Sequence, residues 1–410
     1  MAPIPEPHRP TYTWTEDVED LEQYSPGGYH PVHINDQIHG RYRIVHKLGF
    51  GSYSTVWLAR DEQEMRFVAL KIIIAAASGE SRETQILRHL SAGNPAHPGR
   101  RYVTILLDSF EIQGPNGSHR CLVTEVAGSS VGTVRYEADG NKLPVPVARK
   151  IASQFLQGLQ YLHSCGVVHG DFHLGNVLLG IPDFDSWPVD KVYEHFGKPR
   201  KRPVTRVDGA PLTAAAPSYA VRPPNPLRLA KLFLNENYDI KISDFGESFL
   251  FTDRTTPPPA SLNTPIALAA PEIIFNDSPG PKADVWALAC TIFEVLGDHS
   301  LIESFFAERD EVLVEMVRAF GKLPERWWKQ WENRSTFFEE DGTFKPDSGD
   351  QTGEPRTVDL RERLGQIRRY DADGQTELSG DLEALEVVLG EMLRYEPGER
   401  ISVEDVVLPF

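Results

Sequence analysis

The sequence predicts an α+β fold with two lobes, a small β-rich lobe followed by a larger, mainly helical one. From about residue 41 to residue 126, apolar and polar residues alternate along short segments, which is typical of strands. After residue 140, apolar residues recur every three or four positions, which indicates amphipathic helices. Between residues 180 and 239, nine prolines predict a largely irregular insertion.

The composition narrows the classes of function. The 410 residues carry a formal net charge of −17, which argues against direct nucleic-acid binding and against an anionic membrane surface, and suits a cationic partner. No apolar run approaches the ~20 residues that span a bilayer, and the first residues do not form a secretory signal. Three scattered cysteines indicate a reducing compartment. We therefore expect a monomer, away from membranes, in the cytoplasm, the nucleus or both.

The first lobe is expected at about residues 41–126, after an extended amino-terminal extension, residues 1–40, that begins with several prolines. Alternation and turn residues predict a hairpin, a third strand, one helix and two further strands. These elements are expected at Arg41–Leu58, Phe67–Ile74, Ser81–Leu90, Val103–Phe110 and Cys121–Val126.

The second lobe is expected at about residues 127–410, interrupted by the insertion at residues 180–239. Helical periodicity predicts four main helices, at Pro146–His163, Asp284–Leu296, Glu311–Phe320 and Asp381–Leu393. Within the insertion, the basic run Lys198–Pro203 is either a nuclear import signal or a solvated basic segment.

A glycine-containing turn and a lysine suggest phosphate binding in the first lobe. The run from Leu48 to Val56 places Gly49 and Gly51 on the turn of the first hairpin, where glycine lets the backbone approach phosphates closely. Alone, two such glycines also fit an ordinary turn. Lys71 lies on the very apolar third strand and needs a partner, for which Glu83 on the next helix is the candidate and Glu80 the alternative.

Three further motifs follow in the second lobe. His169-Gly-Asp-Phe-His-Leu-Gly-Asn176 lies between a helix and an apolar strand, Asp244-Phe-Gly246 follows the insertion, and Ala270-Pro-Glu272 comes after that. With the glycine turn and its lysine, the order and spacing of these motifs resemble those of eukaryotic serine/threonine protein kinases, from about Tyr24 to Phe410. The resemblance implies a bilobal protein-kinase-like fold.

Within that group the chain is most similar to the SR-protein kinase family. The segments that carry this resemblance are Tyr24–Val32, Gly40–Tyr42, Lys47–Gly49 and Ser54–Leu58. That family also has an insertion between the catalytic loop and Asp-Phe-Gly. The resemblance implies transfer of the γ-phosphate of ATP, with Mg²⁺, to Ser or Thr of protein substrates, including Arg/Ser-rich ones.

The resemblance also implies a role for each motif residue. Asp171 would accept the hydroxyl proton, Lys71 paired with Glu83 would bind the α- and β-phosphates, and Asn176 and Asp244 would hold Mg²⁺. The other implied nucleotide contacts are Leu48, Gly49, Gly51, Ser52, Val56, Ala69, Thr124, Glu125 and Ala127. Asp284 would anchor the catalytic-loop backbone, and Arg400 would pair with Glu272.

Several residues depart from the family pattern. Gly170 replaces an arginine and His173 replaces a lysine of the usual catalytic loop. Asp298 and Glu311 fall where the SR-protein kinase family has an acidic groove for arginine-rich substrates, but Arg318 stands where another acid is expected. Two alternatives therefore stay open: a pseudokinase that acts as a scaffold, and a small-molecule phosphotransferase with a similar His-Gly-Asp loop.

Overall fold

The computed structural model describes residues 9–79, 81–230, 233, 238–251, 259, 261–345, 358–367 and 381–410. These residues form two compact units. The first contains the described parts of residues 1–91, 104–129 and 180–232, and the second those of residues 92–103, 130–179 and 233–410.

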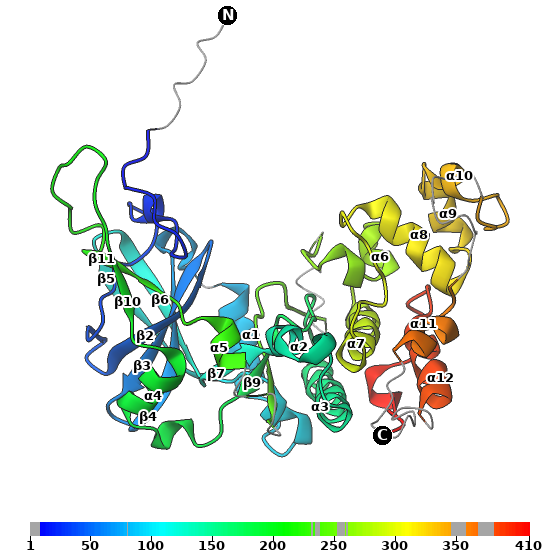
Figure 1. The fold of residues 1–410 in the computed structure, drawn as a ribbon, viewed down its shortest axis with the longest axis horizontal. Coiled ribbons are helices and arrows are strands. Elements are labelled where there is room, and N and C mark those ends of the chain that lie inside the picture. Colours follow the sequence, from blue (N-terminus) through cyan, green and yellow to red (C-terminus); the bar gives the residue numbers. More distant parts are fainter. Residues whose placement is uncertain are drawn as a thin grey trace, which may run out of the picture. The chain divides into compact units, whose positions relative to one another are not determined.

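A six-stranded antiparallel sheet with the strand order β1-β2-β3-β4-β6-β5 forms the first unit's centre (Figure 1). Its strands are β1 (Gln37–Ile38), β2 (Tyr42–Gly51), β3 (Ser54–Asp61), β4 (Arg66–Ile73), β5 (Leu106–Gly114) and β6 (Gly117–Thr124), and helix α1 spans Arg82–Ser91. One sheet face buries alternate apolar residues, such as Val68, Leu70 and Ile72 of β4. The predicted β-rich lobe is thus confirmed, with element ends shifted by a few residues.

The insertion differs from the irregular segment that its prolines predict. It contains α4 (Val189–Phe196), α5 (Pro226–Ala230) and the antiparallel strands β10 (Arg200–Pro203) and β11 (Tyr219–Arg222). Val192, Phe196 and Leu229 pack in a buried cluster with Val45 and Phe67 of the sheet. Its prolines are compatible with these elements because they lie outside them or at their ends: Pro188 precedes α4 and Pro226 begins α5.

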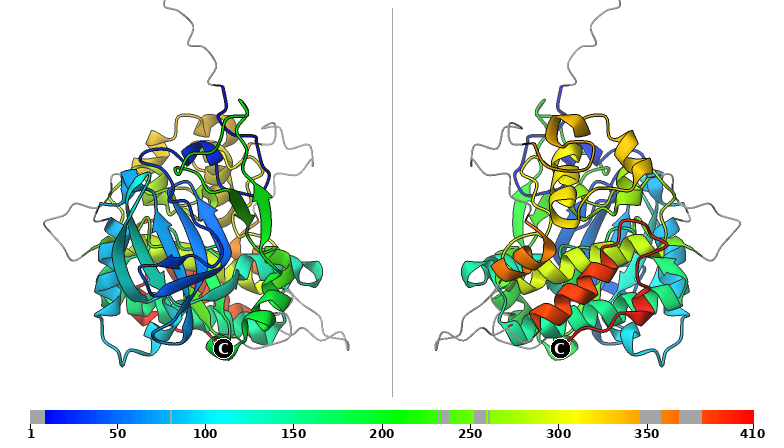
Figure 2. Two further views of the ribbon diagram at one scale, coloured as in Figure 1. Left: turned by 90° about the vertical axis from the view of Figure 1, so that its left-hand side faces the viewer. Right: turned by 90° about the vertical axis from the view of Figure 1, so that its right-hand side faces the viewer.

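The amino-terminal extension is packed against the first unit from Tyr12 onward. We call residues 9–32 the arm. Tyr12, Val18 and Leu21 of the arm lie in a buried apolar cluster with Val204 and Ala220 of the insertion. Figure 2 shows the dark-blue arm beside the green insertion. The extended arm that the sequence predicts is therefore part of the first unit's core.

The second unit is mainly helical, as predicted. Its helices are α2 (Val131–Glu137), α3 (Val145–Ser164), α6 (Pro271–Ile274), α7 (Pro281–Leu296), α8 (Arg309–Phe320), α9 (Glu325–Gln330), α10 (Arg334–Phe337), α11 (Leu360–Gln366) and α12 (Leu382–Met392). Helix α7 is buried along almost its whole length because it packs against both α3 and α12 (Figure 2).

Two short antiparallel strand pairs lie beside these helices. β8 (Val167–Val168) pairs with β13 (Phe249–Leu250), and β9 (Val177–Gly180) pairs with β12 (Ile240–Ile242). A further strand, β7, spans Ala127–Ser130. No helix in the described part of the chain is long and apolar enough to cross a membrane.

Short 3-10 helices complete the fold. They are η1 (Leu21–Gln23), η2 (Ala75–Ala77), η3 (Pro98–Tyr102), η4 (Asp139–Asn141), η5 (Phe184–Ser186), η6 (Ile266–Leu268) and η7 (Val403–Asp405).

Candidate active site

Lys71 and Glu83 form the ion pair that the sequence predicts in the first unit. Lys71 Nζ, on β4, donates to both carboxylate oxygens of Glu83, on α1, at 2.6 and 2.8 Å. Both side chains are partly buried, 28% and 15% exposed, so water screens the pair less than a surface pair. The alternative partner, Glu80, lies outside the described residues.

Four of the predicted nucleotide contacts share one face of the sheet. Val56 on β3 lies opposite Lys71 on β4, and Ala69 on β4 lies opposite Thr124 on β6. Residues directly opposite in an antiparallel sheet point to the same face, and Ala69 and Lys71 are two positions apart on one strand. All four side chains are half-buried, whereas the intervening residue Leu70 is fully buried on the other face.

The remaining first-unit contacts lie at the ends of strands. Leu48, Gly49 and Gly51 are on the last part of β2, and Ser52 begins the two-residue turn into β3. A Cβ atom built at Gly49 or Gly51 would meet nothing within 4 Å, so the backbone here is open to close approach. Glu125 is exposed just after β6, and Ala127 begins β7.

In the second unit, Asp171 and Asn176 are joined within one loop. Asn176 Nδ2 donates to Oδ2 and to the backbone carbonyl of Asp171, each at 2.9 Å. Asp171 Oδ1 is buried and has no hydrogen-bond partner among the described residues. A buried carboxylate oxygen without a partner is costly, which is typical of a functional position, and the Asp171 side chain as a whole stays 19% exposed, so a bound hydroxyl can approach the carboxylate.

Asp244 is held beside this loop through its neighbour. The backbone carbonyl of Asn176 accepts hydrogen bonds from both Ser243 N–H, at 2.9 Å, and Ser243 Oγ, at 2.8 Å. Asp244 itself has a φ of +61°, a strained conformation that is common at functional sites. The structure thus brings Asp171, Asn176 and Asp244 together in the second unit.

Asp284 anchors the catalytic loop, as the resemblance implies. Its carboxylate accepts the backbone N–H groups of His169 and Gly170, at 2.8 and 2.9 Å. The ring of His169 bridges Ser243 and Asp171. Its Nε2 lies 3.1 Å from the carbonyl of Ser243, and its Nδ1 accepts a hydrogen bond from Asp171 N–H. Burial lowers the pKa of His169, which favours this neutral, hydrogen-bonded ring.

The structure accounts for both substitutions in the loop. Gly170 has a φ of +79°, where an arginine backbone would be strained, and its carbonyl accepts a 2.5 Å hydrogen bond from Thr264 Oγ1. His173 Nδ1 accepts from Gly175 N–H at 3.0 Å, and its Nε2 lies 3.6 Å from Asp171 Oδ2. A side chain at Gly175 would collide with the His173 ring, so the glycine leaves the room that this ring position needs.

The predicted pair of Arg400 and Glu272 is also present. Arg400 donates to both oxygens of the Glu272 carboxylate, at 2.8 and 3.1 Å, and both side chains are buried. Arg400 further donates to the carbonyls of Lys282, Arg394 and Tyr395. The pair ties the short helix α6 to the carboxy-terminal segment of the second unit.

Asn176 and Asp244 fit Mg²⁺ by the chemistry of their oxygens. The amide nitrogen of Asn176 is used by Asp171, which leaves its amide oxygen without a partner among the described residues. Among the residues that the structure describes, Asp244 Oδ1 accepts only a long hydrogen bond, from Gly246 N–H at 3.3 Å. The described residues contain no group of three or more His, Cys, Asp or Glu ligands. Two oxygen ligands completed by phosphates and water are typical of Mg²⁺.

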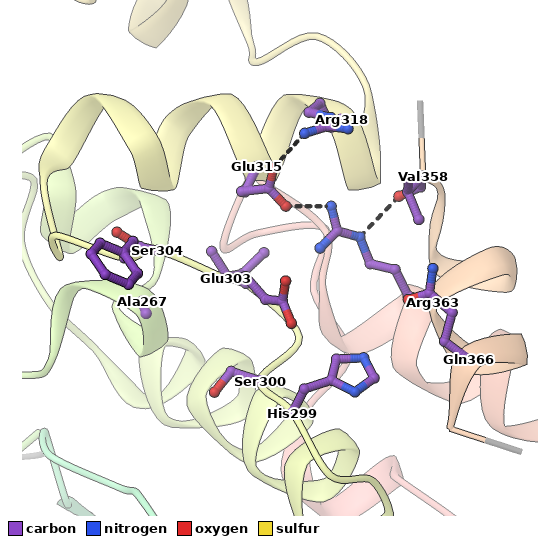
Figure 3. Close-up of a pocket in the computed structure, with 12 residues that line it drawn as sticks. Ala267, His299, Ser300, Glu303, Ser304, Glu315, Arg318, Val358, Arg363 and Gln366 are labelled. Atoms are coloured by element: carbon purple, nitrogen blue, oxygen red, sulfur yellow. Dashed lines mark hydrogen bonds and ion pairs between the residues drawn. The ribbon is translucent and has the colours of Figure 1, made fainter. Parts of the chain in front are cut away.

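A polar pocket of about 650 Å³ lies among α8, α11 and the segment after α7. Its acidic residues are Glu303 and Glu315, which no motif in the sequence indicates; Asp298 and Glu311, which the resemblance places in an acidic groove, do not line this pocket. Figure 3 shows Glu315 between two guanidinium groups, those of Arg318 and Arg363, at 2.9 and 2.7 Å. Glu303 has no hydrogen-bond or ionic partner among the described residues, and its carboxylate points toward the middle of the pocket (Figure 3).

The two acids expected there have other partners. Asp298 pairs with Lys142 and His299, and these hydrogen bonds outweigh the effect of burial and lower the pKa of Asp298 to about 2. Glu311 accepts from Ser304 Oγ and Phe306 N–H, which lowers the pKa of Glu311. They fasten the segments that flank the pocket and do not line it.

Comparison with known proteins identifies the family. The protein kinase domain family matches residues 42–185 and 227–408, and the gap between these ranges lies inside the insertion. The chain is 42% identical to SRSF protein kinase 3 of Homo sapiens over 41% of this chain and 30% of that protein. It therefore spans less than a third of that relative's length.

Two relatives are covered more fully. The chain is 30% identical to a serine/threonine protein kinase of Aspergillus fumigatus over 80% of this chain and 77% of that protein. It is 29% identical to serine/threonine-protein kinase SRPK of Physarum polycephalum over 94% and 89%, respectively. Together with the paired residues of both units, these matches show that the chain belongs to the protein kinase family, as a serine/threonine protein kinase of the SR-protein-kinase-like type.

Proposed function

We propose that this kinase transfers phosphate from ATP to serine or threonine of basic protein substrates, with Asp171 as the base that accepts the proton of the hydroxyl. The observation that carries the proposal is the partly exposed carboxylate of Asp171, oriented by Asn176 through Oδ2, while its Oδ1 has no partner among the described residues. Asp171 accepts the proton as the hydroxyl oxygen bonds to the γ-phosphorus. The bond between the γ-phosphorus and the β–γ bridging oxygen breaks, and ADP leaves.

The other residues position the phosphates of ATP and neutralise their charge. Lys71, held by Glu83, binds the α- and β-phosphates as a fixed cation. The backbone of Gly49, Gly51 and Ser52 covers the phosphates, since open glycines permit that approach. Asn176 and Asp244 hold Mg²⁺, which supplies charge neutralisation at the phosphates.

All of these groups are present, and Lys71 is hydrogen-bonded to its expected partner Glu83, which argues against a pseudokinase that acts only as a scaffold. The pair of Arg400 with Glu272 speaks against a small-molecule phosphotransferase, because those enzymes lack the Ala-Pro-Glu segment and the helix after it. The protein substrate is therefore the better supported acceptor.

Basic substrates are supported by charge. The net charge of −17 favours cationic partners, and Glu303 offers a carboxylate that has no cationic partner among the described residues. Phe305, 91% exposed and also lining the pocket, adds an aromatic face on which a guanidinium group can stack. Arg318 and Arg363 already occupy Glu315, so we assign the pocket one substrate cation, at Glu303.

Labelled ATP and three acceptor types test this proposal. We expect transfer to an Arg/Ser-rich peptide, weaker transfer to the same peptide with arginine replaced by glutamine, and none to a panel of amino alcohols. Glu303→Gln should raise KM for the Arg/Ser-rich peptide about two- to fivefold, the effect of one exposed charge pair. Glu308→Gln, an exposed acid outside the pocket, is the matched control.

Three outcomes would contradict the proposal. Equal transfer to the two peptides would exclude the basic specificity, and transfer to an amino alcohol would favour the small-molecule enzyme. No transfer to any acceptor would favour the scaffold.

A further inference from the structure

The glycine turn is held by a side chain from the arm. The hydroxyl of Tyr29 donates a 2.7 Å hydrogen bond to the carbonyl of Gly51, the last residue of β2. The turn is otherwise open, since Tyr53 is 70% exposed and Gly51 has free space around it. Among the described residues, no other side chain donates a hydrogen bond to the backbone of residues 49–53.

Tyr29 is itself fixed at three further points. It is buried, its N–H donates to the carbonyl of Gln23 at 2.9 Å, and its ring packs against Tyr24 at 5.7 Å. The carbonyl of Tyr29 accepts from Asn116 Nδ2 at 2.7 Å, and the same amide group donates to Ala215 of the insertion at 2.8 Å. The hydroxyl therefore reaches Gly51 from a rigid support.

The arm holds β2 at a second position. Lys47, fully buried on β2, pairs with the buried carboxylate of Glu19, which also accepts from the hydroxyl of Tyr24. Lys47 Nζ lies 5.2 Å from the Trp57 ring. Burial lowers the pKa of Lys47 and Glu19 opposes that shift, so the paired charges depend on each other.

The insertion fastens the arm in turn. Thr13 N–H donates to the carbonyl of Thr205 at 2.9 Å, and Val207 N–H donates to the carbonyl of Thr11 at 3.0 Å. The apolar cluster of arm and insertion residues, described above, lies next to these bonds. The contacts thus run without a break from the insertion, through the arm, to β2 and its turn.

The peptide plane explains what the bond from Tyr29 does. The carbonyl of Gly51 and the N–H of Ser52 belong to one planar trans peptide, in which the two groups point in opposite directions. A hydrogen bond that fixes the carbonyl toward Tyr29 therefore fixes the N–H of Ser52 away from it. Without this bond, the pairing of Gly51 with Ser54 in the hairpin would constrain the glycine less, and the turn would lose more conformational entropy on binding.

We propose that Tyr29 is a positioning residue for the nucleotide turn: its hydroxyl orients the Gly51–Ser52 peptide so that the Ser52 N–H is set for a phosphate of ATP. This inference rests on the proposed function, in which that turn covers the phosphates. Through Glu19 and Tyr29, the arm and the insertion support the strand and the turn that bind the nucleotide.

Tyr29→Phe tests the proposal because it removes only the hydroxyl. The matched control is Tyr219→Phe, which removes another phenol in the first unit, one that accepts a 3.1 Å hydrogen bond from Ile34 N–H away from the turn. Calorimetry measures the Kd for ATP, and amide hydrogen exchange reports on residues 49–54 without nucleotide. Thermal unfolding of both variants shows that each is folded.

We expect Tyr29→Phe to weaken ATP binding about two- to tenfold, the effect of one lost hydrogen bond, and to speed exchange at the turn. Tyr219→Phe should change neither. Wild-type protein that binds no ATP would overturn the proposed function and this inference with it. If wild-type protein binds ATP, and Tyr29→Phe has the same Kd for ATP and the same exchange rate at the turn, only the role of Tyr29 is overturned.

Discussion

Asn176 holds Asp171 by two hydrogen bonds from one amide nitrogen, each 2.9 Å long, to the carboxylate and to the backbone carbonyl. The bonds fix which carboxylate oxygen is occupied and leave Oδ1 free of partners among the described residues. The same residue accepts two hydrogen bonds from Ser243, the neighbour of Asp244. Asn176 therefore links the proposed base to the proposed metal ligand through its own backbone and side chain.

Replacement of Lys71 should remove activity with little loss of stability. Lys71→Met leaves Glu83 without its cation, but neither side chain is fully buried, so the loss of folding stability is smaller than for a fully buried pair. We expect kcat to fall at least ~100-fold because the phosphates lose a fixed charge. Steady-state kinetics and thermal unfolding measure the two effects. Arg43→Met, which breaks the exposed pair with Glu62, is the control, and an equal kcat in Lys71→Met and wild type would contradict the role of Lys71.

The enzyme should be active without phosphorylation of its activation segment, which is the stretch between the Asp244-Phe-Gly246 and Ala270-Pro-Glu272 motifs. Gly170 supplies no cation for a phosphate, and the hydroxyl of Thr264 already binds the carbonyl of Gly170 directly. Phosphatase-treated protein should keep its kcat/KM for a peptide substrate within about twofold. Loss of activity on dephosphorylation that is restored by rephosphorylation would contradict this expectation.

Stability should fall in acid through His30 of the arm. Burial, with a contribution from nearby His119, lowers the pKa of His30 to about 4, whereas an exposed histidine titrates near 6.5. Between these values the unfolded chain binds the extra proton and the folded chain does not. The stability is therefore fully present above pH ~6.5 and is lost as the pH falls toward 4.

Urea unfolding between pH 7.5 and 4.5 measures this effect. His30→Gln should flatten the decline relative to wild type, whereas His39→Gln, at an exposed position, should not. An identical pH dependence in wild type and His30→Gln would show that His30 is not the group responsible.

The buried pair of Arg400 and Glu272 should dominate the stability of the second unit's carboxy-terminal segment. Arg400→Met leaves the Glu272 carboxylate buried without its cation, which typically costs about 3–5 kcal/mol. Arg361→Met, which breaks the exposed pair with Glu386, should cost at most about 1 kcal/mol. Chemical denaturation compares the two variants, and equal losses would contradict the importance of the buried pair.

The site was predictable where function fixes residue types at set spacings. Lys71, Asp171 and Asp244 lie in short motifs, and their order along the chain identified them. Asp284 and Arg400 followed from the same resemblance, and the structure confirms their partners.

Contacts made by the arm, the insertion and the pocket were not predictable in this way. Tyr29 meets Gly51 through tertiary packing, and no spacing in the sequence indicates that meeting. Nine prolines predicted an irregular insertion, because composition does not reveal that Pro188 and Pro226 lie at helix starts. Lys47, a charged residue on a largely buried strand, is the sequence feature that could have indicated a buried acidic partner, which the structure shows to be Glu19.

The most direct test of the account is phosphate transfer by wild type and Asp171→Asn, measured side by side. With labelled ATP and an Arg/Ser-rich protein, we expect wild type to form phosphoserine or phosphothreonine. Asp171→Asn should bind ATP with nearly unchanged Kd but transfer phosphate at least ~100-fold more slowly, because only the acceptance of the proton and the orientation of the hydroxyl are lost. Near wild-type transfer by Asp171→Asn, or no transfer by wild type, would contradict the account.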